Sequence, residues 1–84
     1  MEKHLYEVYW ETKTAKGVRR YSRSFRYEIL AVPFFAEKKR KETTTMAFCR
    51  EVAVSYDDRG RATEIRFVRL LCAHLVADAS VATK

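Results

Sequence analysis

Few side chains of this 84-residue chain have the types and spacing that catalysis requires. Ser22 and Ser24 lack the G-x-S-x-G setting that exposes and activates a serine hydroxyl. Cys49 is expected on a buried face, where a thiol is inert. The Asp57–Asp58 pair fits a charged turn and has no further ligands for a magnesium ion. The sequence therefore predicts no catalytic residues and a protein that is not an enzyme.

Metal and cofactor sites are not indicated either. His4, Cys49, Cys72 and His74 are too far apart in the chain to match the close ligand pairs of zinc sites. With only two glycines, the chain has no glycine-rich phosphate loop. Two cysteines do not make a disulfide framework, and both thiols are expected to be free in a reducing compartment. We expect no metal, no cofactor and a cytoplasmic location.

Anion binding is the chemistry that the sequence favours. One basic run contains no acidic residue and holds six cations, Lys13, Lys16, Arg19, Arg20, Arg23 and Arg26. A second basic run consists of Lys38, Lys39, Arg40 and Lys41. Guanidinium groups bind phosphate through paired hydrogen bonds, and tyrosine rings stack on bases. Together with Arg66, these residues are the candidate binding site for nucleic acid or for an acidic protein surface.

The composition limits the class of protein. The net charge is +6, and 48% of the residues are hydrophobic, which is too many for a disordered chain. No apolar run approaches the ~20 residues of a membrane span, and charges within the first ten residues argue against a signal peptide. A positive balance favours acidic partners, although charge that only promotes solubility is an alternative explanation.

An antiparallel hairpin is predicted to position the first basic run. Leu5–Thr12 and Val18–Ile29 alternate between two faces, as strands do, and a short turn ending at Gly17 separates them. A turn centred on Ala15 and Lys16 pairs residues whose numbers sum to 31. This register aligns the apolar sides of the strands and sets the following partners opposite one another: Trp10 and Tyr21, Val8 and Arg23, Tyr6 and Phe25, and Glu11 and Arg20.

The same alternation divides the cations between two faces. Arg20 and Arg26 are predicted to point outward, and Arg66 is expected to extend their face if its strand is adjacent. Arg23 falls on the aromatic side, where it either extends past the rings or lies over Trp10 or Tyr21 as a cation–π contact. Glu11 is expected to neutralise part of the charge of Arg20.

The second half of the chain is open to two interpretations. Pro33 is expected to end the second strand, Phe34–Ala36 is a short apolar patch, and Glu37–Glu42 is interpreted as a loop or an independent turn. Residues 46–56 match an amphipathic helix that begins after three threonines. The alternative is a hairpin in which Val52–Tyr56 turns at Asp57–Gly60. The helix accounts for more residues and is preferred, and Ala62–Leu71 is predicted to be a strand.

These elements predict a small α+β domain of β-β-α-β order. An antiparallel hairpin and a third strand pack one sheet face on the helix, which leaves the other face exposed. Residues 1–77 are expected to form a single domain, and residues 78–84, which are rich in alanine, a flexible tail.

Two functions of different classes follow. The first is a non-enzymatic protein that contacts nucleic acid through the basic hairpin and the KKRK loop. The segment Gly17–Ile29 (GVRRYSRSFRYEI) resembles the strands of phage-integrase arm-site domains, which implies recognition of a DNA groove by a three-stranded sheet. The alternative is a protein-binding inhibitor or adaptor of a phage or mobile element, of the anti-CRISPR kind. It has candidate interface aromatics at Tyr9, Phe34 and Phe35, and it is expected to form a homodimer if a sheet edge is free.

Overall fold

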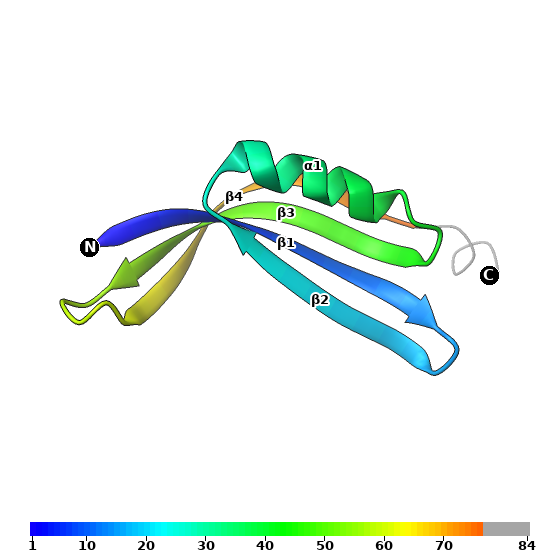
Figure 1. Ribbon diagram of the computed structural model, residues 1–84, viewed down its shortest axis with the longest axis horizontal. Helices are drawn as coiled ribbons and strands as arrows, with labels where there is room; N and C mark the ends of the chain where they lie inside the picture. Colours follow the sequence, from blue (N-terminus) through cyan, green and yellow to red (C-terminus); the bar gives the residue numbers. More distant parts are fainter. Residues whose placement is uncertain (77–84) are drawn as a thin grey trace.

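The computed structural model describes residues 1–76 as a four-stranded antiparallel sheet with one helix (Figure 1). The elements follow the chain in the order β1 (Glu2–Thr14), β2 (Gly17–Phe25), α1 (Glu28–Lys39), β3 (Thr44–Tyr56) and β4 (Ala62–Leu75). The strands lie in the order β2-β1-β3-β4, so β2 and β4 are the two edges. The molecule is elongated and measures 51 × 25 × 21 Å.

The predicted hairpin is confirmed with its register. β1 pairs with β2 through Tyr6 and Phe25, Trp10 and Tyr21, and Glu11 and Arg20. The two-residue turn is stabilised by Thr14, whose hydroxyl donates to the carbonyl oxygen of Gly17 at 2.8 Å. Gly17 has a φ of 130°, a conformation that side chains disfavour and that explains why glycine stands here.

The position of the helix differs from the prediction. Residues 28–39, expected to be a strand end, a short apolar patch and part of a loop or turn, form α1, and Pro33 lies inside it. Proline removes one backbone hydrogen bond, yet it fits here because tertiary packing holds the helix: Ala31 and Phe35, four residues apart, are both buried. Glu28 in the first turn and Lys38 in the last complement the helix dipole.

Residues 46–56 are not helical, so the preferred interpretation was wrong and the alternative hairpin is correct. β3 pairs antiparallel with β4, as Val54 with Ile65, and also with β1, as Val8 with Cys49. Residues 51–54 of this central strand are all buried, so burial does not follow the alternation that identifies a strand. In the turn, Asp57 accepts hydrogen bonds from the backbone N–H groups of Arg59 and Arg61, both at 2.9 Å.

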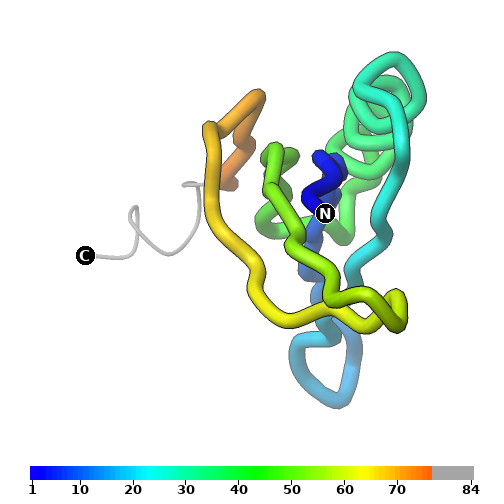
Figure 2. The backbone as a smooth tube through the Cα atoms, turned by 90° about the vertical axis from the view of Figure 1, so that its left-hand side faces the viewer, coloured from blue at the N-terminus to red at the C-terminus, as the bar shows by residue number. Residues whose placement is uncertain are grey.

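The core lies between α1 and one face of the sheet, which we call the covered face. Its central buried residues come from three elements: Val8, Ala31, Phe35, Ala47 and Cys49. The helix lies toward the β1–β2 side, and β4 runs along the opposite margin (Figure 2). The other side of the sheet, the open face, has no described element packed on it.

The chain is therefore α+β, of mostly antiparallel sheet, and its order is β-β-α-β-β and not the predicted β-β-α-β. α1 has 12 residues, and within residues 1–76 no helix is long and apolar enough to cross a membrane. The expectation of a flexible tail at 78–84 falls outside the described residues.

Candidate nucleic-acid interface

The fold brings the two basic runs together at one end of the molecule. The backbone N–H of Lys13 donates to the carbonyl oxygen of Thr43 at 2.8 Å, which ties the β1–β2 turn to the segment after α1. That segment is itself ordered, because the N–H of Thr44 donates to the carbonyl oxygen of Lys41 at 3.0 Å. We call the resulting group of cations the basic end: Lys13, Lys16, Arg19, Lys38, Lys39, Arg40 and Lys41.

Aromatic rings lie beside these cations on the covered face. Trp10 of β1 stacks on Tyr21 of β2 with ring centroids 5.3 Å apart, and Phe34 of α1 meets Trp10 edge-on at the same distance. The ammonium group of Lys38 lies 5.0 Å from the Trp10 ring centroid and 4.8 Å from that of Phe34. Such contacts hold a cation in place without neutralising it.

Arg23 is held in the same way. Its guanidinium lies 5.2 Å from the Phe25 ring centroid and 5.4 Å from that of Phe34. The sequence predicted a cation–π contact for Arg23 but over Trp10 or Tyr21. The rings differ from that prediction because Phe34, expected in a short apolar patch after the second strand, belongs to α1 and faces the sheet.

Most of the predicted binding cations have no carboxylate partner. Within residues 1–76, no Asp or Glu oxygen lies within 4.0 Å of the charged nitrogens of the basic end, or of Arg23 or Arg26. Arg20 is different, because its Nε lies 3.5 Å from Glu11, as the register required. The charges of the basic end are therefore available to an anionic partner.

Two predicted cations lie away from the basic end. Arg66 does not extend the face of Arg20, because β3 separates β4 from β1 and Arg66 instead donates to Glu2 at 3.1 Å. Arg26 follows β2 at a bend and lines a shallow depression with Lys3, His4 and Tyr27.

The three candidate interface aromatics are placed differently from one another. Phe35 is 3% exposed and belongs to the core. Phe34 is partly buried among the rings just described. Tyr9 lies on the open face, where its ring stacks on Phe48 at 5.1 Å. Its hydroxyl donates to Glu11 at 2.5 Å, and this hydrogen bond to a carboxylate raises the pKa of Tyr9.

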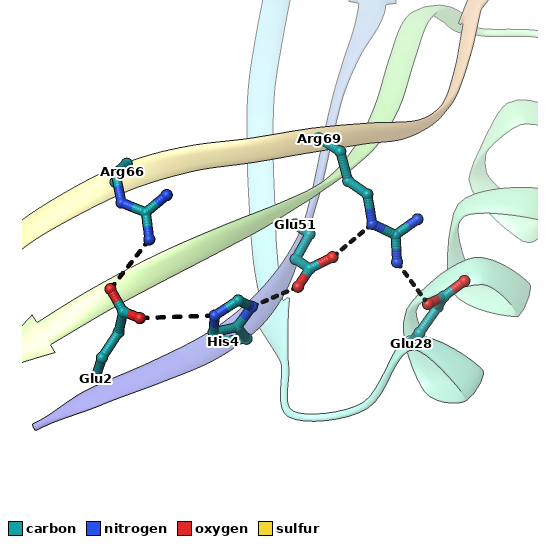
Figure 3. A network of polar contacts seen from close by, with 6 residues as sticks. All are labelled: Glu2, His4, Glu28, Glu51, Arg66 and Arg69. Atoms are coloured by element: carbon teal, nitrogen blue, oxygen red, sulfur yellow. Dashed lines mark hydrogen bonds and ion pairs between the residues drawn. The ribbon is translucent and has the colours of Figure 1, made fainter.

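A polar network that sequence reasoning missed occupies the covered face beyond the N-terminal end of α1 (Figure 3). Glu51, 7% exposed, receives hydrogen bonds from Nδ1 of His4 at 2.5 Å and from Nε of Arg69 at 2.7 Å. Arg69 also reaches Glu28 at 3.2 Å, which links β4 to the start of α1. The sequence could have predicted the Glu51–Arg69 pair only if residues 46–56 had been assigned to a strand, because the β3–β4 pairing places these two residues opposite one another.

The buried carboxylate of Glu51 is satisfied by hydrogen bonds. An ionised carboxylate only accepts, so Nδ1 of His4 carries the hydrogen that bonds to Glu51. This bond, with that of Arg69, holds the pKa of Glu51 below its usual value, although burial acts in the opposite direction. In the described part of the chain, no group of three or more His, Cys, Asp or Glu residues is placed to hold a metal ion. The network therefore fits a structural role.

The two cysteines lie opposite one another in the sheet. Cys49 of β3 is the cross-strand partner of Cys72 of β4, and both are free thiols. Burial raises the pKa of Cys49 to about 11, with a smaller effect from Cys72. A thiol with this pKa is almost entirely protonated at neutral pH and is a poor nucleophile.

Comparison with protein-family models, with curated proteins and with solved structures finds no match to this chain.

Proposed function

We propose that this protein is a non-enzymatic binding protein that contacts nucleic acid through the basic end. The observation that supports this proposal is the hydrogen bond from Lys13 to Thr43, because it unites two basic runs that are separate in the sequence. Phosphate groups attract such a cluster at any base sequence, and the release of counterions supplies most of the affinity.

The aromatic neighbours of the basic end support single-stranded nucleic acid as a ligand. Tyr21 is 40% exposed and stacks on Trp10, which fixes its ring without covering it. Proteins that bind single strands combine a basic track for the backbone with aromatic rings on which bases stack. Tyr21 lies on β2 between Arg19 and Arg23, both of which lack a carboxylate partner in the described chain.

The test compares two double variants with equal net charge. K13Q/K41Q removes two cations of the basic end, and R59Q/R61Q removes two from the turn between β3 and β4. Binding of a fluorescent oligonucleotide is measured by anisotropy between about 50 and 300 mM salt. Removing one cation that neutralises a phosphate reduces the slope of log K against log[salt] by ~0.7 for a single strand or ~0.9 for a duplex. For two such cations we expect a reduction of about 1.4 to 1.8 in K13Q/K41Q, and none in R59Q/R61Q.

A third variant, Y21A, tests the stacking role. It is expected to weaken binding to a single strand about tenfold or more, with little change in the salt slope, because stacking contributes ~1–3 kcal/mol per base. No binding of DNA or RNA at about 50 mM salt, or equal losses in both double variants, would contradict the proposal.

The alternative is a protein-binding inhibitor or adaptor that uses the same cations against an acidic protein surface. The unpaired cations support it equally, because Coulomb attraction does not distinguish phosphate from carboxylate. A pull-down from the native host, with and without nuclease, separates the two. Protein recovered after nuclease treatment, and absent when K13Q/K41Q is the bait, would favour the inhibitor.

A further inference from the structure

The open face carries an apolar strip along β3 and β4. Side chains alternate between the two faces of a strand. On β3, the core residues Ala47 and Cys49 point to the covered face, so the residues between and beside them point to the open face. The β3–β4 register then aligns Val52 with Phe67 and Val54 with Ile65. We call the following nine residues the β3–β4 strip: Met46, Phe48, Val52, Val54, Ile65, Phe67, Leu70, Ala73 and Leu75.

The strip is strongly exposed where it follows β4. Ile65, Phe67, Leu70 and Leu75 expose 65%, 54%, 55% and 71% of their surface. The only charged side chain among the open-face positions of these two strands is Arg50, and it is already paired with Glu7 at 2.6 Å. Within β3 and β4, covering the strip therefore buries apolar area without leaving a charge unpaired, and Lys3 of β1, beside Val54, lies at its margin.

No part of the described chain is available to cover this strip. α1 packs on the covered face, against β1 and β3. Residues 77–84, which follow β4, contain a single large apolar residue, Val81. The protomer also has a small core, with eight buried hydrophobic residues among those described. Small domains with small cores often gain stability by association.

We propose that a second copy of this chain covers the strip, and that two sheets pack face to face through a two-fold axis. An apolar strip is complementary to itself under such an axis, since each contact is made twice. Sheets that pack in this way lie ~10 Å apart with strands within ~30° of alignment. This inference is independent of the proposed binding of nucleic acid.

The area is that of a weak, reversible dimer. On β3 the strip runs from Met46 to Val54, which at ~3.3 Å per residue makes it about 30 Å long. Two strands are about 10 Å wide, and Leu5 and Tyr9 of β1 widen the surface to about 14 Å. Flat footprints of about 300 to 420 Å² per copy total roughly 600 to 840 Å², below the ~1,200 Å² of a stable interface. Val52 and Val54 are already buried in the protomer, so β4 supplies most of the surface that a second copy covers.

Charge repulsion favours an arrangement in which the strands of the two copies run in opposite directions. Each protomer carries +6, and its basic end lies at one end of the 51 Å long axis. With the two-fold axis perpendicular to the strands, the two basic ends lie at opposite ends of the dimer, where repulsion is smallest. The neutral strips meet in the middle.

Sedimentation velocity of the full chain over about 1–200 μM, in about 0.3 M salt after nuclease treatment, tests the proposal. We expect wild-type protein to shift from 9.9 kDa toward twice that mass as its concentration rises. Phe67→Glu and Leu70→Glu each place a charge in the interface and are expected to raise the dimer Kd about 100-fold or more. Both side chains are more than half exposed in the protomer, so folding tolerates the change.

Ile29→Glu is the matched control. Ile29 is 78% exposed on the outer side of α1, beside Val32 and Pro33, and lies outside the strip. The control should leave the dimer Kd unchanged, and circular dichroism should show the same secondary structure in all three variants. Monomeric wild-type protein at the highest concentration, or a dimer that only Ile29→Glu dissociates, would overturn the proposal. A dimer that persists in both strip variants would overturn it as well.

Discussion

The ion pairs of the sheet change faces between its two halves, although the same strands run through both. Beneath α1, the covered face is apolar at Val8, Trp10 and Cys49, and the open face holds the ion pairs Glu7–Arg50 and Glu11–Arg20. Beyond the N-terminal end of α1, the covered face holds the His4–Glu51–Arg69 network, and the open face is apolar at Leu5, Val52 and Phe67. Within β1, Tyr6 packs against the core, whereas two residues away on the same face His4 belongs to the network, as Figure 3 shows for His4.

This difference shows that the apolar side of a strand is a local property. A strand of 13 residues is long enough to pass from one environment to another, and each segment follows the element that covers it. On the covered face, the half under α1 is completed within the chain. The β3–β4 strip on the open face has no such cover along its length, and this contrast motivates the dimer proposed above.

The largest effect is expected from truncation of a core side chain under α1. Phe35→Ala should lower the free energy of unfolding by about 3–4 kcal/mol, because it leaves a cavity in a core with few large residues. Phe67→Ala, beyond α1, should lower it by about 1 kcal/mol or less, because Phe67 is half exposed. Urea unfolding, at a protein concentration where sedimentation shows a monomer, measures both.

Equal losses from these two substitutions would remove the contrast between the halves. The wild-type m-value should be retained in both variants, since a changed slope would indicate a different native or unfolded state and would make the free energies incomparable.

The second test measures how completely the cysteines under α1 are protected. The pKa of about 11 for Cys49, against an ordinary value of 9.0, reduces its thiolate fraction about 100-fold. Cys72→Ser leaves Cys49 as the only thiol. In this variant a colorimetric thiol reagent at about pH 8 should react at least about 100-fold more slowly with folded than with urea-unfolded protein. Rapid reaction of the folded protein would show that this half opens readily.

The smallest effect is expected from the network in the other half. The pKa of Glu51 is lower in the folded chain than its ordinary 4.5, so its contribution to stability is present above that pH. The contribution is lost as the pH falls through the lowered value. Wild-type protein should therefore lose more stability than Glu51→Gln between about pH 5 and about pH 3, as judged by urea midpoints.

Glu64→Gln is the control for this experiment, because Glu64 is exposed on β4 and forms no ion pair among the described residues. Its acid dependence should match that of wild-type protein. The assigned role of Glu51 is wrong if Glu51→Gln and wild type show the same dependence.

The sequence was sufficient to predict the register of the β1–β2 hairpin, because a short turn and two distinct faces fix one pairing, but the second strand ends at Phe25 and not at Ile29. It was not sufficient for β3. Cys49, Val52 and Ala53 are buried on both faces of a central strand, and their spacing matches a helix as well as a strand. Pro33 led to the opposite error. It predicted the end of an element, but it lies inside α1, which tertiary packing keeps helical.

The candidate site was also predictable only in part. The cations themselves are visible in the sequence, but only the pairing of β1 with β3 reveals which of them are neighbours. Lys13 lies beside Thr43, close after the second basic run, whereas Arg66 lies on the edge strand β4 at the far margin of the sheet. Each of these placements depends on contacts between residues far apart in the chain.

The pairing of β1 with β3 also sets an order of folding. β1 and β2 are adjacent in the chain and need only close a two-residue turn, but Glu2 pairs with Ser55, and all of β2 and α1 lie between them. Closing a loop of this length is entropically costly and slows folding relative to local contacts. During synthesis, the inner edge of β1 therefore stays unpaired until residues 44–56 have left the ribosome.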